Sequence, residues 1–211
     1  MKITAHTGCE KTPDNSLLSI EAGARAGADI VEFDLHFNEN AEPVLSHNQP
    51  KGGEVSLEGA FEALAGYEGL FANIDIKSTA CLEKIYPLAC RRGVENRIFL
   101  TGVGEKWAES VKAQCPQIPF YLNASIKNKK DFVSICEALD KTAEIGAIGI
   151  NIHYKNLTPR LASECKKRGL LLSVWTVDNP LAMRRILRLA PDNITTRKPS
   201  KLKKLINCSK K

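Results

Sequence analysis

Apolar, β-branched runs alternate with segments of helical periodicity along all 211 residues, and this alternation predicts an α/β fold, a small single-domain (β/α)8 TIM barrel. The length is close to the lower end of the range of roughly 200 to 400 residues for such barrels. No Gly-rich phosphate-binding fingerprint follows the first apolar run, which makes an open, doubly wound sheet the weaker alternative.

Eight strands are expected where the apolar runs are continuous. In chain order they cover 3–6, 30–37, 71–76, 97–101, 120–123, 148–153, 171–177 and 193–195. Segments with apolar residues every three or four positions predict the helices. These cover 16–27, 56–65, 80–92, 105–114, 129–140, 158–168, 179–189 and 200–207. A short run at 43–46 is expected to pair back on the second strand as a hairpin.

Proline and glycine support the limits of the later helices. Pro159 and Pro180 stand at the starts of two predicted helices, where the first turn tolerates proline. Gly169 follows the end of another, a common position for a residue that terminates a helix.

The chain shows no internal repeat, low-complexity segment or linker, so we expect one domain over 1–211. Departures from the barrel repeat are limited to a short excursion over 48–72 and a basic helix and tail over 199–211. No apolar run approaches the roughly 18 residues that span a bilayer, so we expect no transmembrane segment.

The net charge of +6 conceals an uneven distribution along the chain. Residues 1–79 hold 13 acidic and 5 basic side chains, a net charge of −8, and the remainder holds 11 acidic and 25 basic side chains, a net charge of +14. Nucleic-acid-binding proteins cluster positive charge in this way, but a charged terminal run is more often solvated surface. We therefore expect no nucleic-acid partner.

The seven cysteines indicate a reducing compartment. Their number is odd, their spacing is irregular and no C-x-x-C pair is present, which argues against a disulfide framework or a zinc site. The first predicted strand begins next to Met1 and leaves no room for a signal peptide, so we expect a cytoplasmic protein. Cys9 lies close to His6, but nothing nearby specifies the third group of a nucleophilic triad.

The second predicted strand carries an unusual set of polar residues. Glu32, Asp34 and His36 alternate with apolar residues, so their side chains share one face. An inward-pointing pair of carboxylates requires a cation or hydrogen-bond donors, and hard oxygen ligands suit Mg²⁺ or Ca²⁺. A solvent-facing edge strand is the alternative explanation.

Other polar residues follow the neighbouring strands. His6 ends the first strand, Asp75 and Lys77 share a face of the third, and His47 follows the hairpin run. Taken singly, each has a structural explanation: a hydrogen-bonded histidine, an inward salt bridge or, for Trp175, core packing. In a (β/α)8 barrel the carboxyl ends of the strands form the active site, so the combination predicts a catalytic site.

Six ordered motifs carry a family resemblance. The strings A-H-T-G, D-N-S, G-A-D-I-V-E-F-D-L-H, P-V-L-S-H-N, N-I-D-I-K and V-W-T-V-D resemble the glycerophosphodiester phosphodiesterase family, from the first strand to Pro199. The resemblance implies a metal-dependent TIM-barrel phosphodiesterase that releases glycerol 3-phosphate and an alcohol, with one divalent ion, Mg²⁺ or Ca²⁺.

The resemblance also implies roles for individual residues. The metal ligands would be Glu32, Asp34 and Asp75, and the general acid/base pair would be His6 and His47. The substrate-binding residues would be Lys77, Trp175 and Thr7, and the residues supporting the site would be His36, Asn15 and Asn48. Two histidines with an ordinary pKa near 6.5 suit both proton-transfer roles near neutral pH.

The sequence departs from the family pattern at several of these positions. Thr7 replaces an arginine, Asp75 replaces a glutamate, and Asn48 replaces the aspartate after the second histidine. The cap that the family inserts before the third strand is nearly absent. We therefore expect an open mouth that accepts a bulky or polymeric alcohol, and activity with altered substrate preference.

Two alternatives stay open. One is a catalytically impaired barrel that binds phosphorylated ligands, which the changes at Thr7 and Asn48 favour. The other is a phospholipase D-like enzyme acting on lysophospholipids, with weak contact between its basic tail and a membrane surface. The sequence leaves the oligomeric state undetermined.

Overall fold

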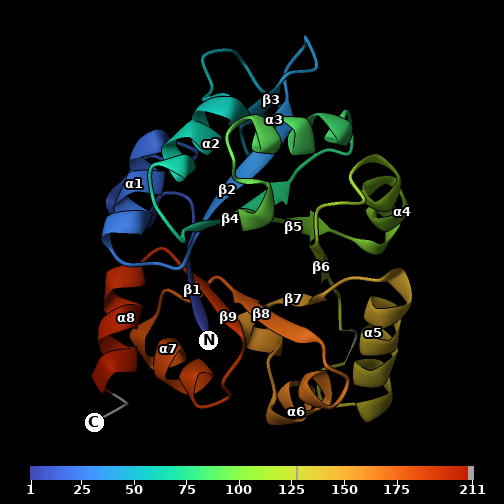
Figure 1. Cartoon of the computed structure of the whole chain (residues 1–211). Helices are drawn as coiled ribbons and strands as arrows, with labels where there is room; N and C mark the ends of the chain where they lie inside the picture. Colours follow the sequence, from blue (N-terminus) through green and yellow to red (C-terminus); the bar gives the residue numbers. More distant parts are fainter. Residues whose placement is uncertain (127, 209–211) are drawn as a thin grey trace.

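Eight parallel strands close into a barrel in the computed structural model, which describes residues 1–126 and 128–208 (Figure 1). The barrel strands are β1 (Lys2–Ala5), β2 (Ile30–Phe37), β4 (Phe71–Ile76), β5 (Ile98–Val103), β6 (Phe120–Asn123), β7 (Gly149–His153), β8 (Leu171–Trp175) and β9 (Asn193–Thr196). They pair in the order β1-β9-β8-β7-β6-β5-β4-β2, and a β1–β2 pairing closes the ring. The predicted fold class is confirmed.

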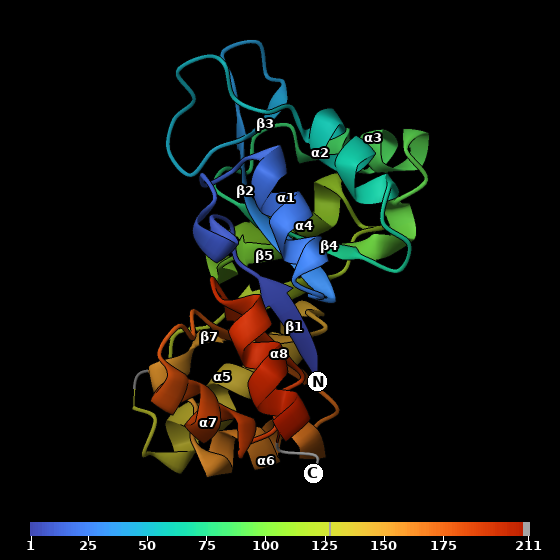
Figure 2. The same ribbon diagram turned by 90° about the vertical axis from the view of Figure 1, so that its left-hand side faces the viewer.

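Helices surround the barrel on its outside (Figures 1 and 2). They are α1 (Leu17–Arg25), α2 (Leu57–Ala65), α3 (Ile85–Arg91), α4 (Glu105–Gln114), α5 (Phe132–Ile145), α6 (Pro159–Lys167), α7 (Pro180–Leu187) and α8 (Pro199–Cys208). Short 3-10 turns precede or follow some of them: η1 (Cys9–Lys11), η2 (Leu82–Lys84), η3 (Glu95–Arg97) and η4 (Tyr154–Asn156). The prolines at the starts of α6 and α7 stand in the first helical turn, as the sequence predicts.

The hydrophobic core lies between the strands and the helices. Because side chains alternate along β2, Val31, Phe33 and Leu35 point outward into this core, where each is about 1% exposed or less. Inside the barrel, a small apolar cluster lies near the amino ends of the strands, where Phe99 and Tyr121 pack edge to face with their ring centroids 5.5 Å apart.

Above this apolar floor the inside of the barrel is polar. One polar side chain per strand forms this layer: Thr4, Glu32, Asn73, Thr101, Asn123, Asn151, Ser173 and Asn193. Some neighbours in the layer are joined by hydrogen bonds, such as Thr4 Oγ1 to Asn193 Oδ1 at 2.8 Å and Thr101 Oγ1 to Asn73 Oδ1 at 2.8 Å. Since (β/α)8 barrels usually fill this space with branched apolar residues, the polar layer marks the end that carries chemistry.

A short antiparallel strand, β3 (Pro43–Leu45), pairs with the end of β2 and confirms the predicted hairpin. Residues 46–56 connect β3 to α2 and contain no helix or strand beyond a bridge between Val44 and Ser56. These segments extend from one side of the barrel (Figure 2). The near absence of a cap is therefore confirmed.

Two predicted helices have other limits in the structure. The expected helix over 80–92 is interrupted, because Cys81 adopts a left-handed conformation with φ 53° and η2 separates it from α3. The helix expected over 129–140 begins later, where the Asp131 side chain accepts a hydrogen bond from Ser134 N, and it ends at Gly146, whose φ of 81° suits a helix terminator.

Some predictions concern the C-terminus and the chain as a whole. The basic helix is α8, and residues 209–211 of the predicted tail lie outside the described residues. Among the described residues, no helix combines the length and apolarity that crossing a bilayer requires. All seven cysteines have free thiols, in agreement with the expectation of no disulfide framework.

Candidate active site

A cavity of 780 Å³ opens at the carboxyl ends of the barrel strands. Ten of the eleven predicted site residues line it: His6, Thr7, Asn15, Glu32, Asp34, His47, Asn48, Asp75, Lys77 and Trp175. Strand ends converge at this edge of a closed barrel, so residues far apart in the sequence become neighbours here.

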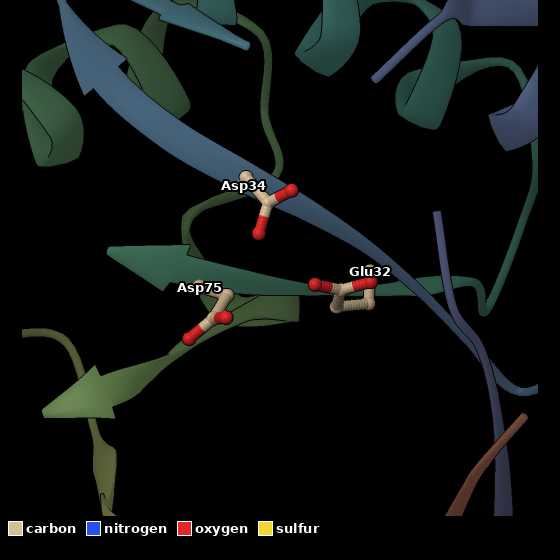
Figure 3. Close-up of side chains that lie close together, drawn as sticks. All are labelled: Glu32, Asp34 and Asp75. Atoms are coloured by element: carbon tan, nitrogen blue, oxygen red, sulfur yellow. The ribbon is translucent and has the colours of Figure 1, made fainter. Parts of the chain in front are cut away.

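Three carboxylates form the centre of the cavity. Glu32 and Asp34 lie on β2 and Asp75 on β4, and Asp34 is paired in register with Asp75. One oxygen of each side chain lies within 4.8 Å of the others, and the three side chains occupy one shared space (Figure 3). Glu32 and Asp34 are only 5% and 4% exposed. Their arrangement agrees with the strand alternation seen in the sequence.

The surroundings shift the pKa values of Glu32 and Asp34 in opposite directions. Burial and the charges of Asp34 and Asp75 raise the pKa of Glu32 well above its usual value. Burial also acts to raise the pKa of Asp34, but the Lys77 ammonium and a hydrogen bond from Asn15 outweigh it and hold that pKa below its usual value.

Lys77 is the cation that this cluster contains. Its Nζ lies 2.8 Å from Asp34 Oδ1 and 2.6 Å from Asp75 Oδ2. Burial acts to lower the pKa of Lys77, but Asp75 and Asp34 outweigh it and raise that pKa to about 12. One ammonium cannot neutralise three carboxylates, so the ionised cluster attracts a further cation. The all-oxygen donor set fits a hard divalent ion such as Mg²⁺ or Ca²⁺.

The two predicted catalytic histidines approach different carboxylates. His6 Nδ1 lies 2.8 Å from Thr7 O and 3.7 Å from Glu32 Oε2. Because a carbonyl oxygen only accepts, Nδ1 of neutral His6 carries the proton and Nε2 is left as the proton acceptor. His47 Nδ1 lies 3.4 Å from Asp34 Oδ1, and its side chain is 66% exposed at the mouth.

Asn15 and Thr7 hold the carboxylates from behind. Asn15 Nδ2 donates to Asp34 Oδ2 at 2.9 Å, and Asp34 N donates to Asn15 Oδ1 at 2.9 Å. Thr7 N donates to Glu32 Oε2 at 2.8 Å, while the Thr7 hydroxyl donates to Asn15 Oδ1 at 3.3 Å. Thr7 is 2% exposed, so its side chain mainly supports the acidic cluster.

Three other predicted site residues lie in different surroundings. His36 lies outside the cavity lining, where its Nδ1 accepts from Phe37 N at 2.8 Å. Asn48 lines the cavity, and its carbonyl accepts from Ser46 Oγ at 2.8 Å. Trp175 is 37% exposed and packs edge to face on His153, with ring centroids 5.5 Å apart. The explanation of Trp175 as a core residue is therefore wrong.

Sequence reasoning did not select Arg197, although it lines the cavity. It follows β9, and its Nε donates to Thr7 O at 3.3 Å. Its Nη2 lies 3.7 Å from Asp14 Oδ1. The guanidinium therefore stands beside Thr7, where the family pattern has an arginine. The signal in the sequence is its place two residues after the last predicted strand, which covers 193–195.

Gly102 on β5 is a second residue that the sequence did not single out. Its φ is 77°, and a Cβ at this position would meet Ile76 O and, at 2.5 Å, Asp75 Oδ1. Only glycine therefore leaves room for the Asp75 carboxylate in its observed position. Three asparagines of the polar layer, Asn73, Asn123 and Asn151, also line the cavity, and the sequence does not single them out.

Comparison with known proteins finds a family that is similar to the part of the chain carrying much of this site. The model of the glycerophosphoryl diester phosphodiesterase family matches residues 6–55, the segment that carries both histidines and two of the carboxylates. A glycerophosphodiester phosphodiesterase from Caldanaerobacter subterraneus is 23% identical, with 97% of each chain covered. The chain is therefore similar to the glycerophosphoryl diester phosphodiesterase family at residues 6–55, and to this relative over nearly its whole length.

Solved structures share the fold of this chain. A glycerophosphodiester phosphodiesterase from Parabacteroides distasonis superimposes with a TM-score of 0.80 at 20% identity, covering 100% of this chain and 98% of that one. A phosphodiesterase from Oleispira antarctica, solved in complex with the product sn-glycerol-3-phosphate, has a TM-score of 0.77 at 17% identity, with 98% and 97% of the two chains covered.

Proposed function

We propose that this protein is a metal-dependent phosphodiesterase that hydrolyses glycerophosphodiesters to glycerol 3-phosphate and an alcohol. The observation that carries the proposal is the buried cluster of Glu32, Asp34 and Asp75, whose oxygens lie within 4.8 Å of one another between His6 and His47. Phosphodiester hydrolysis requires positive charge at the anionic oxygens, a base for the nucleophile and an acid for the leaving alcohol.

The three carboxylates would hold one divalent ion, Mg²⁺ or Ca²⁺. When bound, such an ion supplies charge that stabilises the phosphoryl oxygens in the transition state. The residues around it fit this assignment, because Asn15 and the Thr7 amide already fix the carboxylate orientations without occupying all their oxygens. Oxygen chemistry alone does not select between the two ions.

The chain's own residues would bind the substrate and move its protons. His6 and His47 approach the carboxylate cluster from different elements, so one can accept a proton from the attacking hydroxyl while the other donates to the leaving alcohol. Lys77 and Arg197 would contact the phosphate. Arg197 would take the place of the arginine missing at Thr7, since a guanidinium can bind two phosphate oxygens at once.

The open mouth supports a broad range of alcohols. No helix or strand covers the cavity between residues 46 and 56, and the exposed ring of Trp175 offers a flat wall beside it. The Oleispira antarctica relative holds sn-glycerol-3-phosphate as product, which supports the glycerol phosphate half of the proposed substrate.

Enzymatic detection of glycerol 3-phosphate tests this function. The wild-type chain is assayed on a panel of glycerophosphodiesters, with a lysophospholipid included, in Mg²⁺, in Ca²⁺ and in EDTA. We expect metal-dependent turnover, and a decrease in kcat of about 10² to 10⁴-fold in His6→Ala and His47→Ala. His36→Ala is the matched control, because His36 lies outside the cavity lining.

Two results would change the conclusion. Turnover of no diester in either metal would favour the impaired barrel that binds phosphorylated ligands. Release of the headgroup alcohol from the lysophospholipid alone would favour the phospholipase D-like alternative.

A further inference from the structure

A second cavity adjoins the candidate active site. It has a volume of 710 Å³ and lies between η1 and the start of α8. We call it the basic groove; its lining is Gly8, Glu10, Lys11, Asp178, Arg197, Lys198, Ser200, Lys201 and Lys204. Arg197 lines both this groove and the active-site cavity, so this residue lies between the two spaces.

The carboxylates of the groove are already engaged. Glu10 Oε1 accepts from Ser200 N at 3.1 Å, at the first turn of α8. Asp178 Oδ1 accepts from Arg197 N at 2.7 Å and from the Thr196 hydroxyl at 3.0 Å. Both side chains therefore serve the local backbone and are not placed to neutralise the lysines.

The lysines of the groove lack carboxylate partners within the described part of the chain. Among the described residues, no carboxylate oxygen lies within 4.0 Å of the lysine ammonium groups that line it, those of Lys11, Lys198, Lys201 and Lys204. Lys198 Nζ donates instead to the carbonyl of Asp178 at 3.2 Å. Lys201 and Lys204 are three residues apart on α8, so they lie on the same side of the helix. The groove thus has an excess of positive charge.

The walls of the groove are fixed by the backbone. Glu10 N donates to Arg197 O at 3.0 Å, and the Glu10 side chain caps α8, so η1 is tied to the β9–α8 connection at two points. Glu10 and Lys11 both have positive φ values, 52° and 69°. L-residues adopt this conformation rarely, and the surrounding contacts must hold it. The segments that carry the lysines are therefore held in fixed positions around the groove.

We propose that the basic groove is a second anion subsite, which binds a phosphate group carried by one of the two alcohols of the diester substrate. This inference rests on the proposed function, because it assigns the scissile phosphate to the carboxylate cluster. A cleft lined by one sign of charge concentrates ligands of the opposite sign. Arg197 stands where the two subsites meet, so a single substrate can extend from one to the other. The favoured substrates are diesters with a second phosphate.

Two matched substrates test the subsite. They are glycerophosphodiesters that differ only in a phosphate monoester at the far end of the alcohol. We expect wild-type kcat/KM to be higher for the phosphorylated diester by about tenfold, the size of two exposed charge pairs. The preference should decrease when ionic strength rises, because salt screens exposed charges.

Lysine variants locate the effect. In Lys201→Gln/Lys204→Gln, the preference should fall to about twofold or less, while kcat/KM for the simple diester stays near its wild-type value. The control is Lys112→Gln/Lys166→Gln, which removes the same charge from exposed positions on α4 and α6 and should keep the preference. Equal kcat/KM for the two substrates in wild type, or a preference that survives in Lys201→Gln/Lys204→Gln, would overturn the proposal.

Two further measurements separate the possible outcomes. Isothermal titration calorimetry of both diesters in EDTA requires no turnover, so the groove is tested even where the proposed catalysis fails. Tighter binding of the phosphorylated diester, lost in Lys201→Gln/Lys204→Gln, would support the subsite. Inorganic phosphate serves as the second probe, because it carries the same anionic group without the rest of the substrate. If free phosphate binds the groove and the substrate's second phosphate brings no gain, the groove is a site for phosphate ions and the substrate assignment is wrong.

Discussion

Removal of one carboxylate charge should stabilise the protein when no metal is bound. Glu32 is 5% exposed, and its charge faces those of Asp34 and Asp75. Glu32→Gln removes this charge but keeps the side-chain volume and an oxygen that can accept from Thr7 N. At 4.8 Å and an effective dielectric constant of about 20, one such repulsion is worth roughly 3.5 kcal/mol.

Other charges reduce this figure. Lys77 offsets part of the repulsion, because its ammonium favours the charged form of Glu32. We therefore expect Glu32→Gln to raise the free energy of unfolding in EDTA by about 2 kcal/mol. For a chain of 211 residues this corresponds to an increase in Tm of about 4 to 8 °C.

The increase in Tm that metal produces should be smaller in Glu32→Gln than in the wild type. An ion at 100 times its Kd stabilises a folded protein by about 2.7 kcal/mol, so Mg²⁺ or Ca²⁺ should raise the Tm of the wild type by roughly 5 to 10 °C. Glu32→Gln should show little of this shift. Differential scanning calorimetry at pH 8, in EDTA and in each metal, measures both effects, and Glu68→Gln at an exposed position is the control. A Glu32→Gln protein that is less stable in EDTA and still responds to metal like the wild type would refute the electrostatic reasoning.

Three further outcomes are expected. Arg197→Gln should raise KM for a simple glycerophosphodiester by about tenfold with a smaller change in kcat, because a charge-assisted contact to the phosphate is lost. Steady-state kinetics measures both constants, and a decrease in kcat at unchanged KM would contradict a binding role. Gly102→Ala should displace Asp75 and weaken the metal-induced increase in Tm, and an unchanged shift would argue against the close packing at this glycine. Burial raises the pKa of Cys165 to about 12, so this thiol should stay protonated and unreactive toward a disulfide reagent up to pH 9. The exposed thiol of Cys90 should react, and mass spectrometry of the labelled native protein identifies the modified residue.

The sequence predicted the barrel well because the strand pattern is local. The alternation of Glu32 and Asp34 with Val31, Phe33 and Leu35 determines which side of β2 enters the core, whatever the neighbouring strands are. The same alternation placed the two carboxylates on one face, where the structure finds them.

Residues selected by position across the sheet were harder to predict. Asn123 and Asn151 come together because β6 and β7 pair in register, and Asn151 Nδ2 donates to Asn123 Oδ1 at 3.0 Å. Neither short strand shows this by itself. Arg197 depends in the same way on the closure of β9 against β1, which brings it to Thr7 across most of the chain length. Cys81 illustrates a local failure, since a single left-handed residue interrupted an otherwise helical pattern.

The loop that replaces a cap offers a point of entry for protein engineering. Gly52 and Gly53 have φ values of 102° and 86°, and a Cβ at either would meet no atom within 4 Å, so both positions face open space. Longer surface loops add little closure entropy, and exposed tips of this kind tolerate inserted segments. A lid domain could therefore be grafted between these glycines with little disturbance of the eight strands. Such chimaeras would convert an open barrel into a gated one, in which selectivity is set by an exchangeable module.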